Sequence, residues 1–236
     1  MRPVLIPLYK LMALAFFYPE KAYWEKIEKQ FALCRDLVAG DLAACLNRFM
    51  AHVDTGRDSL ENMQSEYLRL FDVGREVSPY ETEYLTGKAS RKPFALADIT
   101  GFYRAFGFGL NEGLPFKEAP DHIAIELEFM AILTWKEVFA HENQQAEGLE
   151  IVRKARKAFF EEHLARWGFC FCRKVSASRT NGFYGTLSDL LKRVLMEQCD
   201  EYALDAACFD LPLTHDGYRG VRDEQLLCES NPDRER

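Results

Sequence analysis

Apolar side chains recur along most of this chain at intervals of three and four residues, the spacing that places them on one face of an α-helix. The clearest series is Leu60, Met63, Tyr67, Leu70 and Phe71. Asp58 and Glu61 open this series with the spacing of a capping box, and Gly74 follows its last turn. No stretch keeps the alternation of a half-buried strand. The pattern therefore predicts an all-α fold.

The same spacing predicts further helices before and after this one. Three are expected within residues 5–53, and others at 96–106, from residue 120 through residue 134, at 147–166 and around 187–195. Pro120 suits the first turn of its helix, because proline lacks an amide hydrogen that would have no partner there. We expect these helices to form one bundle-like domain.

Two connections interrupt the helical pattern. Residues 73–94 form a long one that carries Pro79, Gly87 and Pro93, and structureless connections of that length in compact domains are often functional. The Gly-rich residues 107–113 end a predicted helix and are a candidate hinge.

These connections define the domain organisation. We assign residues 1–228 to one helical domain, with an N-terminal part at 1–110, a hinge at 107–119 and a C-terminal part at 120–228. Residues 229–236 form a polar tail. The alternative is two helical subdomains joined near residues 107–120.

The charge of the chain narrows its partners. Among 236 residues, 37 acidic side chains oppose 30 basic ones, which gives a net charge of −7. Nucleic-acid binding relies on Lys and Arg that neutralise phosphates, so no nucleic-acid partner is expected. The acids are concentrated, because residues 61–83 hold six against two arginines and residues 111–130 hold five against one lysine. These two segments predict a cationic partner.

Cysteine content and hydropathy indicate the compartment. Seven cysteines cannot all pair in disulfides, so reduced thiols and a cytoplasmic location are expected. The apolar residues 11–18 fall far short of the roughly 20 that span a bilayer. A signal peptide is the alternative for this stretch, but the small-residue cleavage pattern is missing. We place the stretch in the fold and expect no stable membrane insertion.

Known catalytic and cofactor motifs are missing from the sequence. No Glu-x-x-His pair, phosphate-binding P-loop or G-x-S-x-G elbow occurs. His122 and Glu126 could share a metal, but no third ligand can be named. We therefore predict no enzyme, no cofactor and no metal site. The alternative is a metal- or redox-active protein that uses Cys170, Cys172, Cys199 and Cys208.

Several short motifs, in this order and spacing, resemble one known family. They are Glu-Tyr-Leu-Arg-Leu-Phe at 66–71, Ser-Pro-Tyr-Glu-Thr at 78–82, Pro-Asp-His-Ile at 120–123, His-Leu-Ala-Arg-Trp at 163–167 and Phe-Tyr at 183–184. Together they resemble the TorD/DmsD/NarJ family of molybdoenzyme maturation chaperones over residues 4–200. Thr82 departs from the serine often found in the family, and the segment from Cys170 onward has no counterpart role.

The resemblance implies a function and a set of partners. Such proteins are all-helical cytoplasmic chaperones that bind the N-terminal leader, commonly a twin-arginine signal, of a molybdopterin-containing oxidoreductase subunit. They hold that subunit until its cofactor is inserted and before it is exported. A second possibility within the family is a target without an export signal. Family members occur as monomers or as homodimers that are domain-swapped, which here would exchange helices across residues 107–120.

The resemblance also implies roles for individual residues. The expected leader-binding set is Asp121, His122, Glu126, Tyr80, Glu81 and Tyr84. The expected structural motif set is Glu66, Arg69, Phe71, Pro79 and Pro120. An apolar groove should supply most of the affinity, because burying one Leu or Phe contributes roughly 1.5–3 kcal/mol and an exposed ion pair only about 0.2–1 kcal/mol.

Structural alternatives remain for most of these residues. Asp121 could simply complement a helix N-terminus, and His122 could be a hydrogen-bonded structural histidine. Glu66 and Arg69 could form an ion pair that fixes the long connection. The aromatic residues of that connection could pack onto the bundle. Core positions are expected for Phe71, Leu127, Met130 and Trp167.

Overall fold

The computed structural model describes residues 2–54, 60–85, 88–109, 118–178, 180 and 182–209. The α-helices in these ranges are α1 (Leu5–Phe16), α2 (Lys21–Cys34), α3 (Gly40–Asp54), α4 (Leu60–Phe71), α5 (Lys88–Ala105), α6 (Ile123–Glu142), α7 (Ala146–Phe159), α8 (Ala165–Ala177) and α9 (Phe183–Tyr202). Shorter elements are the 3-10 turns η1 (Glu81–Tyr84) and η3 (Ala206–Cys208) and the π-helical turn η2 (Phe160–Leu164). The all-α prediction is confirmed.

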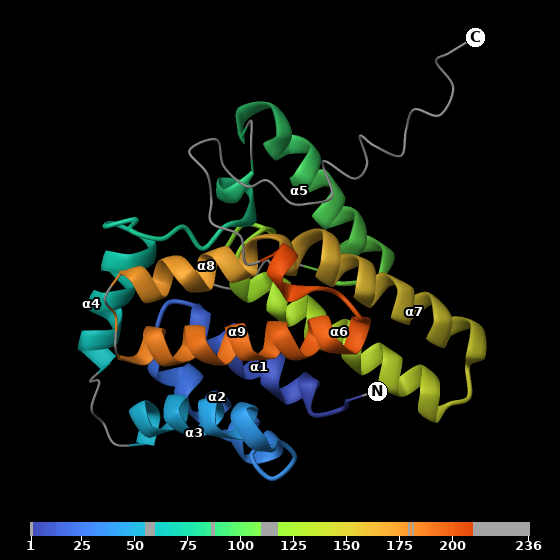
Figure 1. Cartoon of the computed structure of the whole chain (residues 1–236), viewed down its shortest axis with the longest axis horizontal. Helices are drawn as coiled ribbons and strands as arrows, with labels where there is room; N and C mark the ends of the chain where they lie inside the picture. Colours follow the sequence, from blue (N-terminus) through green and yellow to red (C-terminus); the bar gives the residue numbers. More distant parts are fainter. Residues whose placement is uncertain are drawn as a thin grey trace.

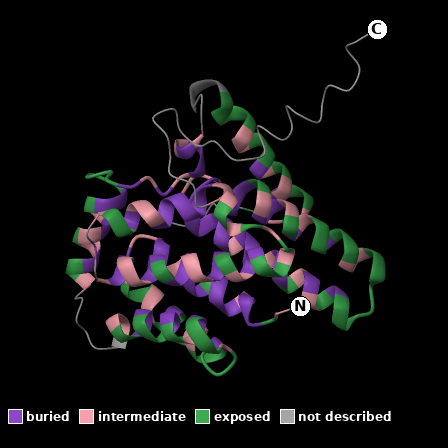
Figure 2. Ribbon diagram, in the orientation of Figure 1, coloured by how far each residue is buried: buried purple, intermediate pink, exposed green. Residues whose placement is uncertain are grey.

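The helices surround a central group made of α1, α6, α8 and α9 (Figure 1). Helix α1 packs against α2 and α6, α9 packs against α3 and α8, and α6 packs against α7. Helices α2 and α3 cover one side of this group, and α5 lies on the opposite side. Buried residues concentrate on the central helices, while much of α2, α3 and α5 faces solvent (Figure 2).

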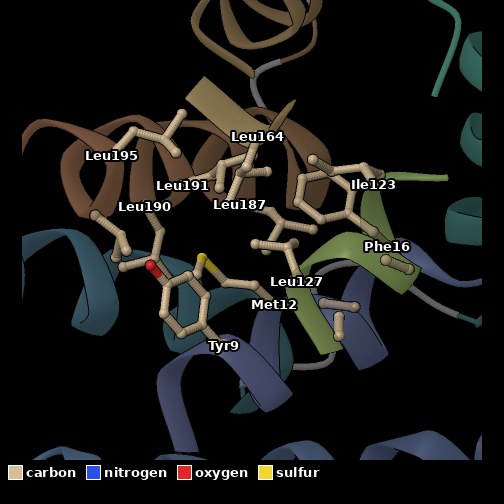
Figure 3. Packing of buried hydrophobic residues seen from close by; sticks show 14 of the residues in the cluster. Tyr9, Met12, Phe16, Ile123, Leu127, Leu164, Leu187, Leu190, Leu191 and Leu195 are labelled. Carbon is tan, nitrogen blue, oxygen red and sulfur yellow. The ribbon is translucent and has the colours of Figure 1, made fainter. Parts of the chain in front are cut away.

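The core forms where α1, α6 and α9 meet (Figure 3). Its central residues, each at most 1% exposed, are Tyr9, Met12, Phe16, Ile123, Leu127, Leu164, Leu187, Leu190, Leu191 and Leu195. The part of α6 from Ile123 to Thr134 is buried on almost every side, as expected for a stretch with apolar residues all round. Phe71, Leu127, Met130 and Trp167 are buried as the sequence predicted.

Three predicted boundaries are wrong. Helix α6 begins at Ile123 with His122 as its N-cap, so Pro120 lies before the helix and not in its first turn. The connection predicted to continue to residue 94 ends at Lys88, and Pro93 lies inside α5, on an exposed stretch of that helix. The single helix predicted at 147–166 is divided, because a π-helical turn follows α7 and α8 then begins.

The predicted glycine end of α5 is confirmed. Gly107 has a φ of +66°, its N–H donates to the Arg104 carbonyl, and the Phe108 N–H donates to the Tyr103 carbonyl. The rings of Tyr103 and Phe108 contact each other at 4.9 Å between centroids. This is a Schellman motif with its hydrophobic contact, and it explains why glycine stands at position 107.

Some predictions fall on residues outside the described ranges. The capping residue Asp58, residues 110–117 of the predicted hinge and the predicted tail at 229–236 are among them. The hinge and the division into two parts therefore stay predictions. Within the described part of the chain, no helix is both long and apolar enough to cross a membrane.

Candidate functional site

Two of the motif segments, 40 residues apart in sequence, lie side by side. The Ile123 N–H donates to the Pro79 carbonyl at 2.9 Å, and the Glu81 N–H donates to the Asp121 carbonyl at 2.9 Å. Tyr80 and His122 thereby form an isolated antiparallel β-bridge. The backbone of the 79–81 segment is docked in this way against the start of α6.

Asp121 fixes the turn that follows the bridge. Its side chain is buried, and Oδ2 accepts hydrogen bonds from the Thr82 hydroxyl at 2.6 Å and from the Thr82 N–H at 3.2 Å. Threonine can replace the serine often found at position 82 in the family, because its hydroxyl donates the same hydrogen bond to Asp121. Asp121 therefore holds η1 in place, rather than standing free at a helix N-terminus.

His122 is a fully buried N-cap. Its Nδ1 accepts a hydrogen bond from the Ala124 N–H at 3.2 Å, so the hydrogen of the neutral ring is on Nε2. Burial lowers the pKa of His122 to about 3. The ring stacks on Phe17 at 6.1 Å and meets the edge of Tyr80 at 5.1 Å. Nε2 has no hydrogen-bond partner among the described residues and lies 3.9 Å from Oε2 of Glu118.

A second buried layer contains Glu81, Glu126, His163 and Trp167. Trp167 donates from Nε1 to Oε2 of Glu126 at 3.1 Å, and Nδ1 of His163 lies 3.1 and 3.3 Å from the two Glu81 oxygens. Burial, followed by the charge of Glu81, raises the pKa of Glu126 well above its usual range. This layer connects η1 to α6, η2 and α8.

The sequence analysis did not assign His163 and Trp167 to the site. Both lie in a motif that carried the family resemblance, but helical spacing placed His163 in one regular helix at 147–166, and Trp167 was expected only as a core residue. The π-helical turn changes the register around His163, and such turns occur frequently at functional sites. The signal available in the sequence was the spacing of His163 and Trp167, because residues four apart lie on the same face of a helix.

The other predicted residues brace the docked segment. Tyr84 donates from its hydroxyl to the Ser78 carbonyl at 2.7 Å, and its ring contacts Trp167 at 5.1 Å. The Pro120 carbonyl accepts a hydrogen bond from the Tyr103 hydroxyl at 2.7 Å. Of the residues predicted to bind a leader, Asp121, His122, Glu126, Glu81 and Tyr84 are buried and Tyr80 is half-buried.

Arg69 fixes the start of the long connection. One guanidinium nitrogen is 2.6 Å from Oε2 of Glu76, and the other is 3.8 Å from Oε1 of Glu66. Glu66 also accepts a hydrogen bond from Thr180. The expected ion pair of Glu66 and Arg69 is therefore present, and it extends through Glu66 to Thr180, which lies between α8 and α9.

The surface above His122 combines acids with aromatic rings. We call Phe17, Glu20, Tyr23, Tyr80 and Glu118 the acid–aromatic rim, and each of them is half-buried. Tyr80 donates from its hydroxyl to Oε2 of Glu118 at 2.8 Å, and the Phe17 and Tyr23 rings are 6.1 Å apart. Burial and the nearby charge of Glu20 raise the pKa of Tyr23. The rim can offer ring faces and carboxylates to a cation.

A separate groove of about 550 Å³ lies between the end of α5, the C-terminal half of α6, and α7. Trp135 and Phe139 stack at 5.6 Å on its wall and are 52% and 45% exposed. Phe106 and Val152 line the groove from α5 and α7 sides. We call this the Trp135 groove.

The cysteines of the described residues are not grouped as a metal centre would require. Cys170, Cys172 and Cys199 are buried thiols, Cys208 is half-exposed, and none is in a disulfide. Across the described ranges, no three His, Cys, Asp or Glu side chains are grouped as a metal site would require. The metal or redox alternative therefore has no ligand set in the described structure.

The described part of the chain is thus an all-α fold in which buried polar side chains hold a docked segment beneath an acid–aromatic rim. Residues 35–173, more than half of the chain, match the family model described as nitrate reductase delta subunit. The chlorate reductase assembly chaperone protein of Ideonella dechloratans is 28% identical over 188 residues, which cover 78% of this chain and 84% of the relative.

Two further relatives cover less of their own length. The perchlorate reductase assembly chaperone protein of Dechloromonas aromatica is 28% identical over 146 residues, 61% of this chain and 62% of the relative. The nitrate reductase molybdenum cofactor assembly chaperone NarJ of Escherichia coli K12 is 32% identical over 123 residues, 51% of this chain and 49% of NarJ. The chain belongs to the nitrate reductase delta subunit family, in the TorD/DmsD/NarJ group that its motifs indicated.

Proposed function

We propose that this protein is a cytoplasmic, non-catalytic chaperone that binds the N-terminal leader of a molybdopterin-containing oxidoreductase subunit. It assists assembly of that subunit before export. The observation that carries the proposal is the acid–aromatic rim, to which the docked segment contributes Tyr80. The relatives support it, because each of those named above is an assembly chaperone of a reductase.

In this proposal the buried residues position the docked segment, and the half-buried residues contact the leader. Asp121 and His122 position the docked segment from beneath, and Tyr80 and Glu118 present its outer face. A leader arginine placed on the rim would gain about 0.5–1 kcal/mol from a ring face and about 0.2–1 kcal/mol from a carboxylate. These small contributions to the binding free energy favour an arginine over other side chains. Apolar contacts of the leader supply the rest of the affinity.

Titration calorimetry with a synthetic leader peptide tests this proposal. The peptide is taken from the reductase subunit encoded beside the chaperone, and a second peptide carries Ala in place of its arginines. We expect Tyr80→Ala and Glu118→Gln each to weaken binding of the first peptide about threefold to tenfold, because each removes one rim contact worth about 1 kcal/mol. Their effect on the second peptide should be smaller.

Trp135→Ala is the matched control. It removes a half-exposed aromatic side chain from the Trp135 groove, away from the rim. Leader affinity should be unchanged in this variant. Loss of affinity in Trp135→Ala, with Tyr80→Ala and Glu118→Gln folded and unaffected, would contradict a leader site at the rim.

The same reductase sequence, with or without an Arg-Arg leader, distinguishes an exported from a retained target.

A further inference from the structure

Glu126 is a buried acid with one oxygen that has no donor. The side chain is fully buried at the first turn of α6. Trp167 donates to Oε2, whereas no described N–H or O–H group donates to Oε1. A carboxylate that is buried with an unsatisfied oxygen costs several kcal/mol, so this arrangement needs an explanation.

The neighbours of Glu126 add negative charge and little positive charge. Glu81 from η1 is within hydrogen-bonding reach of its carboxyl group, and Asp121 lies just before the N-cap of α6. Tyr103 faces it from α5 and Trp167 from α8. His163 from η2 faces Glu81 on one side and Asp98 of α5 at 3.4 Å on the other.

The hydrogen bonds indicate where a proton is held. Nδ1 of His163 lies 3.1 and 3.3 Å from the two Glu81 oxygens, and with the ring hydrogen on Nδ1 both oxygens act as acceptors. Trp167 can only donate, so Oε2 of Glu126 is an acceptor as well. Glu81 is the remaining neighbour within hydrogen-bonding reach of Glu126, and Oε1 is the Glu126 oxygen without a donor. A hydrogen bond between two carboxyl groups requires a hydrogen on one of them.

We propose that Glu126 is protonated at neutral pH and donates from Oε1 to the Glu81 carboxylate, so that one shared proton latches η1 onto α6 and α8. We call Glu81, Glu126, His163 and Trp167 the proton latch. One added proton satisfies the orphan oxygen and removes one of two adjacent buried charges. The proposal goes beyond leader binding, because the latch holds the docked segment whatever that segment binds.

The latch makes folding depend on pH in a defined direction. In the unfolded chain Glu126 ionises near its ordinary pKa of about 4.3. In the folded protein burial and Glu81 raise its pKa, so above that ordinary value the folded state keeps a proton that the unfolded state has lost. The stability from this group is complete below the ordinary pKa and is lost as pH rises toward the folded pKa.

Glu126→Gln tests the latch because an amide mimics the protonated acid. Its NH2 group can donate to Glu81 while its oxygen accepts from Trp167. The unfolding equilibrium is measured in urea from pH 5 to pH 9. Relative to Glu126→Gln, the wild type should lose up to tenfold in its folding constant per pH unit, the effect of one proton. The surface variant Glu162→Gln should follow the wild type.

Infrared spectroscopy of the folded wild type gives a second readout that needs no stable variant. A protonated carboxylic acid should contribute its carbonyl band at neutral pH, and Glu126→Gln should lack that band. Parallel pH profiles for the wild type and Glu126→Gln, or a wild type without the band, would overturn the latch. Leader titration at one pH is independent of these results, so the latch and the proposed function can fail separately.

Discussion

At the scale of single residues, burial decides what each polar side chain of the site does. Asp121 and His122 carry the motif that indicated a leader-binding pair, yet both are closed off by Thr82, Phe17 and Tyr80. A buried side chain acts on a ligand through the groups that it positions. We therefore expect substitutions of Asp121 to change stability and binding together.

Asp121→Ala should destabilise the protein by about 1–3 kcal/mol, because it leaves the buried Thr82 N–H and hydroxyl without their acceptor. Leader affinity should fall with it, as the docked segment loosens. Asp121→Asn keeps one oxygen at the same place and should lose less on both measures. Urea unfolding and titration calorimetry supply the two values, and an Asp121→Ala variant with unchanged values on both would contradict the positioning role.

At the scale of elements, a buried arginine joins three helices. Arg156 of α7 is 1% exposed and binds Glu137 of α6 and, from α9, Gln198, Glu201 and Tyr202. Arg153, one turn earlier, binds the same Glu137 at 3.0 Å but is half-exposed. The pair offers a direct comparison of a buried and an exposed cation on one acid.

Arg156→Ala should destabilise the protein by about 3–5 kcal/mol, because Glu137 and its neighbours lose a buried counter-charge. Arg153→Ala is the matched control and should cost about 0–1 kcal/mol. Thermal or urea unfolding of both variants checks the difference. Equal effects would mean that burial does not control the strength of these ion pairs.

At the scale of the whole molecule, α6 connects two separate surfaces. The rim lies over His122 at its start, and Trp135 is 13 residues along it, which corresponds to about 20 Å at 1.5 Å per residue. The residues of α6 from Leu127 to Thr134 that lie between the two surfaces are mostly buried. The two surfaces can therefore change independently while the core remains fixed.

The double variant Tyr80→Ala/Trp135→Ala tests this independence. Its change in unfolding free energy should equal the sum of the single changes within about 0.5 kcal/mol, because sites so far apart rarely share contacts. A larger coupling, measured by urea unfolding of all four proteins, would show that the core transmits strain between the rim and the Trp135 groove.

Sequence patterns predicted the helices well and the site only in part. Leu60 to Phe71 and Leu187 to Leu195 form helices where the apolar spacing placed them, since that spacing records burial against the core. The π-helical turn at Phe160–Leu164 keeps its apolar residues buried, so the spacing of apolar residues did not reveal it. The contact of Tyr80 with His122, and of Glu81 with His163, joins distant segments that no local pattern relates.

The pairing of Pro79 with Ile123 has a consequence for engineering. The chain passes Pro79 and returns beside it at Ile123, 2.9 Å away, so the intervening stretch is closed at its base by backbone hydrogen bonds. Ile99 and Tyr103 pack α5 of this stretch onto the core. Lengthening a closed loop costs only about 0.6 kcal/mol per doubling. A reporter domain inserted after Gly109, an exposed residue beyond the end of α5, should therefore leave the base closed.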